Sequence, residues 1–433
     1  MHPIQRVGQP THPRRPMGFT SAWALGVGTM VGAGIFSLSA DAARYAGPGA
    51  ILSYVIAGAG ALVLAVNFGY LATIHPVSGG PYVYIRDTLG STAAFVAGWQ
   101  LWVGMGLSTS FYCLGFARYL TYFVTAPEYL TAPACVLAVA AVNAMGPRVA
   151  SALQNLSVAI LLIVMGGFML TGVLRVDPAF YAPLLPYGWP GVLDAVPLVF
   201  TSYLGFEMVA QAAGAIQDPR RTVPRAMVAS VLAVTALYAG VMAVSVGVVH
   251  HVDLATSPTP LAEVARRLAG RGGAAAVALG GLVATLSSAN GSMLASLELG
   301  GAMWADGLLP RWLTGGSSGA GRAVGWRPSS VRLGMVAIAV AIAGTWVGRL
   351  DWLARGVGVL HFLPFSVVPL ALLHVLGAPE AARTRPSEAW AARAWAVSAT
   401  AVMGLLLRRI DPLDLWVAAT LTLPGVLWLW RRR

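Results

Sequence analysis

The sequence predicts an all-α polytopic membrane protein, and three observations predict it. The 433 residues are 57% hydrophobic and only 10% charged, whereas a soluble domain carries about 25% charged residues. Apolar segments of roughly 20 residues, long enough to cross a bilayer, recur along the whole chain. The basic residues are all Arg and gather between these segments, as topology signals do. The formal charge of +12 therefore reflects orientation in a lipid bilayer, and we expect no nucleic-acid partner.

Hydropathy predicts about twelve membrane spans, with both termini on the same side. The larger share of the Arg residues falls on the side of the N-terminus, which predicts cytoplasmic termini and a multi-pass protein of the cytoplasmic (inner) membrane. We expect the basic tail, residues 1–17, to be retained, because the apolar run after it is too long for a signal peptide. The expected spans are Phe19–Tyr45, Gly49–Ile74, Ser91–Val124, Ala132–Met145, Ala150–Leu174, Leu193–Ala215, Val223–Val249, Ala274–Met303, Val331–Val347, Ala354–Leu376, Ala391–Leu407 and Leu415–Trp430.

The first span contains a stretch that weakens its own helix. Small residues crowd its middle, and Gly costs roughly 1 kcal/mol relative to Ala in a helix. We expect the helix to break near Gly32, Ala33 and Gly34. Freed backbone groups are tolerated at this depth only where protein or a wet cavity meets them, and freed amides suit a carboxylate. The alternative is close helix packing, since Gly28 and Gly32 form a GxxxG pattern.

The sixth span is also interrupted. Gly205 follows Thr201 and Ser202, whose hydroxyl groups compete for backbone hydrogen bonds. Glu207 is an ionisable group at mid-membrane depth, where such groups usually mark a pathway or a partner. The alternative role for Glu207 is to cap freed amides of its own broken helix.

Two interrupted spans, five helices apart, are typical of an inverted-repeat transporter. Amides of the first break would take a carboxylate. Open carbonyls of the second break, from Thr201 to Leu204, would take an ammonium group. A site with these two ends fits a zwitterion.

The chain resembles bacterial amino acid permeases of the amino acid–polyamine–organocation (APC) superfamily. The matching pieces occur in the family's order over spans one to eight, and they are specific only jointly. They are Gly28-Thr29-Met30-Val31-Gly32-Ala33-Gly34-Ile35-Phe36, His75-Pro76-Val77-Ser78-Gly79-Gly80-Pro81-Tyr82, Tyr203-Leu204-Gly205-Phe206-Glu207, Asp218-Pro219-Arg220-Arg221-Thr222-Val223-Pro224-Arg225 and Met303-Trp304-Ala305-Asp306-Gly307-Leu308-Leu309-Pro310.

The resemblance implies the LeuT-like fold, a five-plus-five inverted repeat with helices one and six broken and two helices added. It divides the chain into the cytoplasmic tail (1–17), a ten-helix transport core (18–377) and two additional C-terminal helices (378–433). It implies that Gly32, Ala33 and Gly34 receive the substrate carboxylate, and that backbone carbonyls around Thr201, Ser202 and Leu204 receive the amino group. Thr29, Ile35 and Gly205 complete the expected substrate-binding set. Glu207 stands where relatives carry an acid linked to gating or proton sensing, and Ala33 stands where they often have Ser.

The energy source stays open. Many proton-coupled relatives carry a Lys on the fifth helix, but this chain has no Lys, and Leu161 stands near the matching position. Exchange or uniport needs no coupling group. Proton coupling would use Glu207 or His361. Sodium coupling would use Ser287 and Ser288, because a hard cation prefers oxygen ligands. Both serines and His361 also fit plain helix packing.

The sequence favours a secondary transporter of neutral, apolar amino acids that binds no cofactor and no metal. Its expected partners are the amino acid, the lipid bilayer and H⁺ or Na⁺ as a coupling ion. The runner-up is an exchanger or exporter of polyamines or cationic amino acids, for which Glu298 is a second candidate acid. A transporter-like sensor without flux is a further alternative. An enzyme is disfavoured, since the few intramembrane His residues form no metal cluster or catalytic set.

Overall fold

The protein is all-helical in the computed structural model, which describes residues 17–76, 79–145, 147–309, 313, 331–377 and 386–432. No β-strand occurs among these residues, and the one isolated bridge joins Met17 to Ile216. Eight of the described helical stretches are long and apolar enough to cross a membrane. The predicted all-α polytopic membrane fold is confirmed, while the count of twelve spans and the inverted repeat stay predictions.

The helices follow the predicted spans closely, apart from α4 and the six-residue α11, which hydropathy does not indicate. Helix α4 begins beside the turn-rich stretch after the second span, with Pro81 in its first turn. The α-helices are α1 (Phe19–Met30), α2 (Ala33–Ala46), α3 (Ala50–Ile74), α4 (Gly80–Leu89), α5 (Ser91–Leu120), α6 (Glu128–Ala144), α7 (Pro147–Val173), α8 (Gly188–Phe200), α9 (Met208–Gln211), α10 (Pro219–Val248), α11 (His251–Thr256), α12 (Pro260–Ala305), α14 (Val331–Thr345), α15 (Leu350–Gly377), α16 (Pro386–Arg408) and α17 (Pro412–Arg432). Short 3₁₀ helices are η1 (Gly47–Gly49), η2 (Pro178–Tyr181), η3 (Thr201–Tyr203) and η4 (Ala213–Ala215).

Helix α12 extends well before the predicted start of its span at Ala274. Its 46 residues include two with non-helical backbone angles, Ala269 and Gly270, so it consists of two helices joined by a kink. The part before the kink carries Glu263 and Arg266, which form an ion pair at 2.7 Å on the exposed surface. This polar segment lacks the hydropathy of a span, which explains why the sequence pattern starts later.

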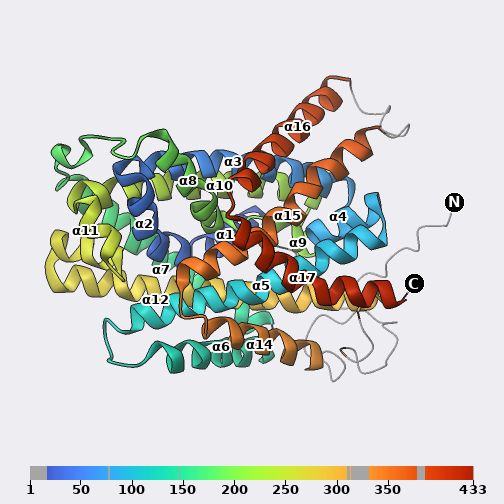
Figure 1. Ribbon diagram of the computed structural model, residues 1–433, viewed down its shortest axis with the longest axis horizontal. Helices are drawn as coiled ribbons and strands as arrows, with labels where there is room; N and C mark the ends of the chain where they lie inside the picture. Colours follow the sequence, from blue (N-terminus) through green and yellow to red (C-terminus); the bar gives the residue numbers. More distant parts are fainter. Residues whose placement is uncertain are drawn as a thin grey trace.

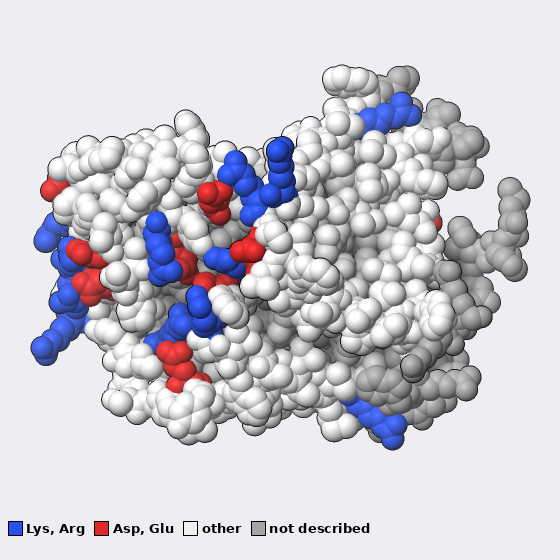
Figure 2. Space-filling view, in the orientation of Figure 1, with Lys and Arg blue, Asp and Glu red and all other residues white. Residues whose placement is uncertain are grey.

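The exterior has the apolar character of a surface that faces lipid. Large apolar side chains stand exposed on α7, α16 and α17, among them Ile163, Leu405 and Trp416. In Figure 2 most of the charged side chains of this face lie on its left half, a few lie at the upper right and lower right, and much of the remaining described surface is uncharged. A water-soluble monomer rarely exposes such large apolar areas.

Helices α5 and α12 run along the longest axis of the molecule and lie against each other, and α3 is packed along α10 (Figure 1). Helix α1 packs on α10, and α2 packs on α8. In this arrangement the α1–α2 break and the α8–α9 break lie in the interior of the protein.

The start of α1 is joined to the segment that follows α9. The Met17 amide donates to the Ala215 carbonyl and the Gln217 amide donates to the Met17 carbonyl, both at 2.9 Å. These two backbone hydrogen bonds form the parallel bridge and hold the entry of the first helix beside the exit of the second break.

Several sequence expectations fall outside the described residues. They concern residues 1–16 of the tail, Val77 and Ser78 of the turn after the second span, and Pro310 at the end of the fifth motif. The boundary between residues 377 and 378 lies at the edge of the described residues.

Candidate functional site

The first helix breaks where its small residues predict, one position earlier than expected. Helix α1 ends at Met30, Val31 and Gly32 leave the helical conformation, and α2 begins at Ala33. Gly32, at the N-cap, provides no side-chain hydrogen bond to the first turn of α2. The first amides of a helix have no acceptor within it. Ala33, Gly34 and Ile35 therefore present a helix N-terminus, which favours an anion.

The second break is longer and contains a left-handed residue. Helix α8 ends at Phe200, η3 follows, and Leu204 is extended with φ −60° and ψ 134°. Gly205 has φ +122°, a value that glycine adopts readily and other residues do not. Of the four carbonyls expected to be open, that of Thr201 accepts the Leu204 amide at 3.3 Å.

The two breaks lie directly against each other. The Thr29 hydroxyl donates to the Gly205 carbonyl at 2.9 Å. A Cβ atom added to Gly205 would lie 2.8 Å from the Thr29 carbonyl carbon, and one added to Gly34 would lie 2.7 Å from the Ser202 Cα. Glycine is needed at both positions, because each backbone approaches the other break more closely than a side chain allows.

A residue that the sequence analysis missed joins the two breaks. The Tyr238 hydroxyl, on α10, lies 2.7 Å from the Met30 carbonyl and 3.0 Å from the Ser202 carbonyl. Its side chain is fully buried. The position of this tyrosine in the middle of a span could have indicated a special role, because tyrosines of membrane proteins are enriched at the membrane–water interfaces.

Glu207 accepts a backbone amide of its own break, which agrees with the alternative role considered for it. Its Oε2 accepts the Gly205 amide at 2.8 Å. Its Oε1 has no hydrogen-bond partner among the residues that the structure describes, although the side chain is buried. The Oε1 oxygen of Glu207 is therefore available for a second role.

The candidate ion-binding serines lie beside the first break. The Ser288 hydroxyl is 3.5 Å from the Thr29 carbonyl oxygen, and a Cβ on Gly32 would collide with Ser288 Oγ. Ser287 is buried next to it on α12. The other coupling candidate, His361, bonds through Nδ1 to the Val357 carbonyl at 2.7 Å. No group of three or more His, Cys, Asp or Glu side chains with metal-binding geometry occurs in the described part of the chain.

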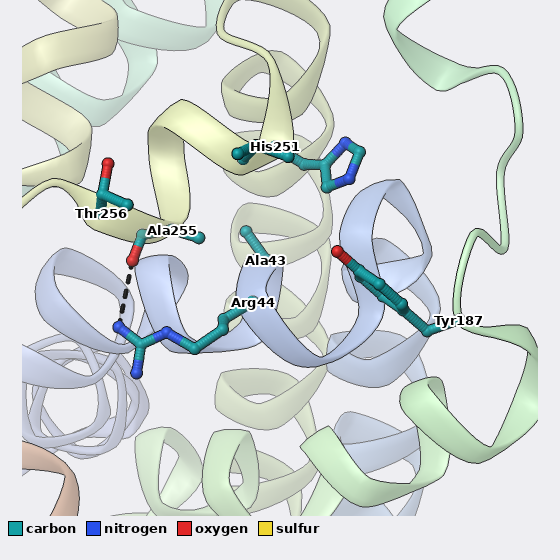
Figure 3. Close-up of a pocket in the computed structure, with 7 residues that line it drawn as sticks. Ala43, Arg44, Tyr187, His251, Ala255 and Thr256 are labelled. Atoms are coloured by element: carbon teal, nitrogen blue, oxygen red, sulfur yellow. Dashed lines mark hydrogen bonds between the residues drawn. The ribbon is translucent and has the colours of Figure 1, made fainter.

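A separate cavity of about 430 Å³ opens at the far end of α2. Figure 3 shows Arg44 donating to the Ala255 carbonyl on one side, with Tyr187 and His251 on the other. Burial, together with the adjacent His250, lowers the pKa of His251 below its usual value. None of the predicted site residues lines this cavity, which is formed by Ala43, Arg44, Tyr187, His251, Val252, Ala255 and Thr256.

The structure thus brings together most of the residues that the sequence singled out. Thr29, Ser202, Leu204 and Glu207 are at most 5% exposed and lie within the two breaks. Ile35 and Thr201 are buried in the adjoining turns. Glu298, proposed as an acid for a cationic substrate, is exposed on α12 instead.

Residues 17–407 match a protein-family model described as amino acid permease. An uncharacterized transporter of Mycobacterium tuberculosis is 34% identical over 316 residues, which cover 70% of this chain and 69% of the relative.

Two relatives from Bacillus subtilis carry named substrates. A branched-chain amino acid permease is 30% identical over 272 residues, 58% of each chain. A methylthioribose transporter is 26% identical over 306 residues, 66% of each chain.

Proposed function

Because the chain belongs to the amino acid permease family of the APC superfamily, we propose that it is a secondary transporter of neutral, apolar amino acids. It works by alternating access in the cytoplasmic membrane, with both termini in the cytoplasm. The substrate carboxylate binds at the α1–α2 break and the amino group at the α8–α9 break. In this proposal Thr29, Gly32, Ala33, Gly34, Ile35, Thr201, Ser202, Leu204 and Gly205 form the substrate site.

The observation that carries the proposal is the contact between two oppositely polarised helix breaks. The first turn of α2 supplies amides without a side-chain cap, which suit a carboxylate. Across from it, Glu207 takes up the Gly205 amide, so the second break offers mainly carbonyl oxygens. An α-amino acid carries one group for each.

The chemistry of the breaks supports a neutral side chain on the substrate. A cationic side chain would require a further acid near the site. Glu207 is the one carboxylate within the two breaks and is engaged by the backbone, while Glu298 is exposed. Branched-chain amino acid permeases among the relatives support the same choice.

The choice of coupling ion depends on which buried oxygen atom takes part in transport. The spare Oε1 of Glu207 supports proton coupling, and the Ser288 hydroxyl beside the Thr29 carbonyl supports sodium coupling. Exchange of one amino acid for another uses neither group.

Uptake by proteoliposomes tests the proposal. Labelled neutral, cationic and acidic amino acids and a polyamine would be supplied to vesicles that are empty, preloaded, or held under a proton or sodium gradient. We expect uptake of neutral apolar amino acids above that of protein-free vesicles. Uptake of cationic substrates alone would contradict the proposed substrate class, and no uptake of any compound would contradict transport itself.

A further inference from the structure

Helix α10 carries a stripe of exposed residues along one of its faces. Arg221, Arg225, Leu232 and Ala236 are all exposed, and they follow one another at helical spacing. The helix packs with its other faces on α1 and α3, and it is long and apolar enough to cross a membrane. The stripe therefore faces lipid along its apolar part.

The stripe begins with its two arginines, at the end of α10 that lies beside the start of the first helix. Leu232, which is 52% exposed, belongs to the apolar part of the stripe. Arg225 lies about 10 Å before it along the helix axis, because an α-helix rises about 1.5 Å per residue. Long basic side chains near the ends of membrane helices extend to the membrane surface. Both guanidinium groups are therefore placed at the level of the lipid head groups.

Neither arginine is neutralised by a close acid. Among the residues that the structure describes, Arg225 makes no hydrogen bond or ion pair. Arg221 lies 3.9 Å from the Asp218 carboxylate, and both of these side chains are exposed, so the pair contributes little. By contrast, the exposed Arg409 forms an ion pair with Asp194 at 2.6 Å. Two positive charges thus remain available on the lipid-facing side of α10.

We propose that Arg221 and Arg225 bind the head group of an anionic phospholipid, whose acyl chains lie along the apolar part of the stripe. The planar guanidinium group matches the oxygen atoms of a phosphate. The apolar stripe continues directly from the two charges, and this favours a lipid over a soluble phosphate, which would make no contact with the stripe. The inference concerns the membrane around the protein and goes beyond the proposed substrate.

The bound lipid would stabilise the connection that follows the second break. The Thr222 hydroxyl, next to Arg221, donates to the Gln217 carbonyl at 2.7 Å. The Gln217 amide in turn donates to the Met17 carbonyl at 2.9 Å. A head group held on the first turns of α10 therefore supports the helix start to which this connection is bonded. We expect anionic lipid to raise the thermal stability of the protein.

Thermal unfolding of the full chain in detergent tests the proposal, with phosphatidylglycerol, phosphatidylcholine of the same acyl chains or inorganic phosphate added in increasing amounts. Phosphatidylglycerol should stabilise the protein to a saturating level, and the other two compounds should have little effect. In the double variant Arg221→Gln/Arg225→Gln, half-maximal stabilisation should require about 25-fold more phosphatidylglycerol, since each basic residue near an anionic lipid surface contributes about a factor of five in affinity.

Arg266→Gln/Arg409→Gln is the matched control. It removes two exposed guanidinium groups that Glu263 and Asp194 already neutralise, so its response to phosphatidylglycerol should equal that of the wild type. Arg221→Lys/Arg225→Lys keeps both charges and should keep most of the stabilisation.

Equal stabilisation by phosphatidylcholine or by inorganic phosphate would overturn the inference. An unchanged response of the glutamine double variant, or an equal loss in the control, would overturn it as well. If the double variant does not fold, Arg221→Gln and Arg225→Gln provide the test singly, each with a response about fivefold weaker. The measurement uses no substrate, so a failure here is distinguishable from a failure of the proposed function.

Discussion

The two helix breaks meet in one buried site, yet they are built in opposite ways. The first is abrupt and has no polar cap, with only Val31 and Gly32 between α1 and α2. The second extends from Thr201 to Glu207 and carries hydroxyl groups and its own carboxylate. The second break thus contains a side-chain acceptor, since Glu207 takes the Gly205 amide, whereas the first turn of α2 has no side-chain cap. The two breaks differ in whether a carboxylate of the chain already occupies a freed amide.

The largest effect is expected at the point where the breaks touch. Gly34→Val would place a Cβ 2.5 Å from the Ser202 Cβ and push the two breaks apart. Overpacking of this kind costs about 1–3 kcal/mol, so we expect substrate affinity to fall about tenfold or more in a binding assay. Gly167→Val is the control, since a Cβ there meets no atom within 4 Å. Unchanged affinity in Gly34→Val would refute the carboxylate site.

A pair of variants at Glu207 separates its capping role from proton sensing. Glu207→Gln keeps an oxygen for the Gly205 amide, so the break should survive, while the pH dependence of uptake should be lost. Glu207→Ala leaves that buried amide without a partner, which costs about 1–3 kcal/mol, and should also lower thermal stability. A pH profile of Glu207→Gln identical to that of the wild type would leave Glu207 as a structural cap.

Thr29→Val tests the hydrogen bond that joins the breaks. It removes the donor to the Gly205 carbonyl, and we expect a loss of stability of about 1 kcal/mol together with about fivefold weaker substrate binding. Thr285→Val is the matched control, because the buried Thr285 hydroxyl bonds to Gly281 and Leu282 of its own helix. Equal effects of both variants on binding would show that the bond between the breaks has no special role.

The smallest effect is expected at Ser288. Its hydroxyl meets the Thr29 carbonyl at 3.5 Å, the outer limit of a hydrogen bond. We expect Ser288→Ala to change uptake by no more than about twofold, measured with and without a sodium gradient. A much larger loss that high sodium restores would contradict this and would assign a sodium site to the first break.

The sequence predicts the breaks well, because each depends on local chemistry. Clustered small residues weaken the helix near Gly32, and Gly205 beside two hydroxyl residues marks the second interruption. The nearby carboxylate of Glu207 also suggested its own capping role. These features depend on residues only a few positions apart in the chain.

The parts that escaped prediction depend on contacts between distant residues. Tyr238 bonds to Met30 and Ser202, which are 208 and 36 positions away, and no local pattern indicates such a partner. The close contact of Gly34 with Ser202 likewise follows from the packing of α2 against α8 and η3. Helix α4 escaped for a different reason, since it is short and its hydropathy resembles that of a connection.

The bridge between Met17 and the segment around Ile216 has a consequence for how relatives diverge. Its two hydrogen bonds use only backbone atoms, so they place no demand on side-chain identity at positions 17, 215 or 217, apart from excluding proline where an amide donates. Homologous chains can therefore change all three residues and still keep the start of the first helix tied to the end of the second break. A connection made only by backbone hydrogen bonds is hard to detect in a sequence alignment. Substitution by proline at positions 17 and 217 would reveal it, whereas other side-chain substitutions would not.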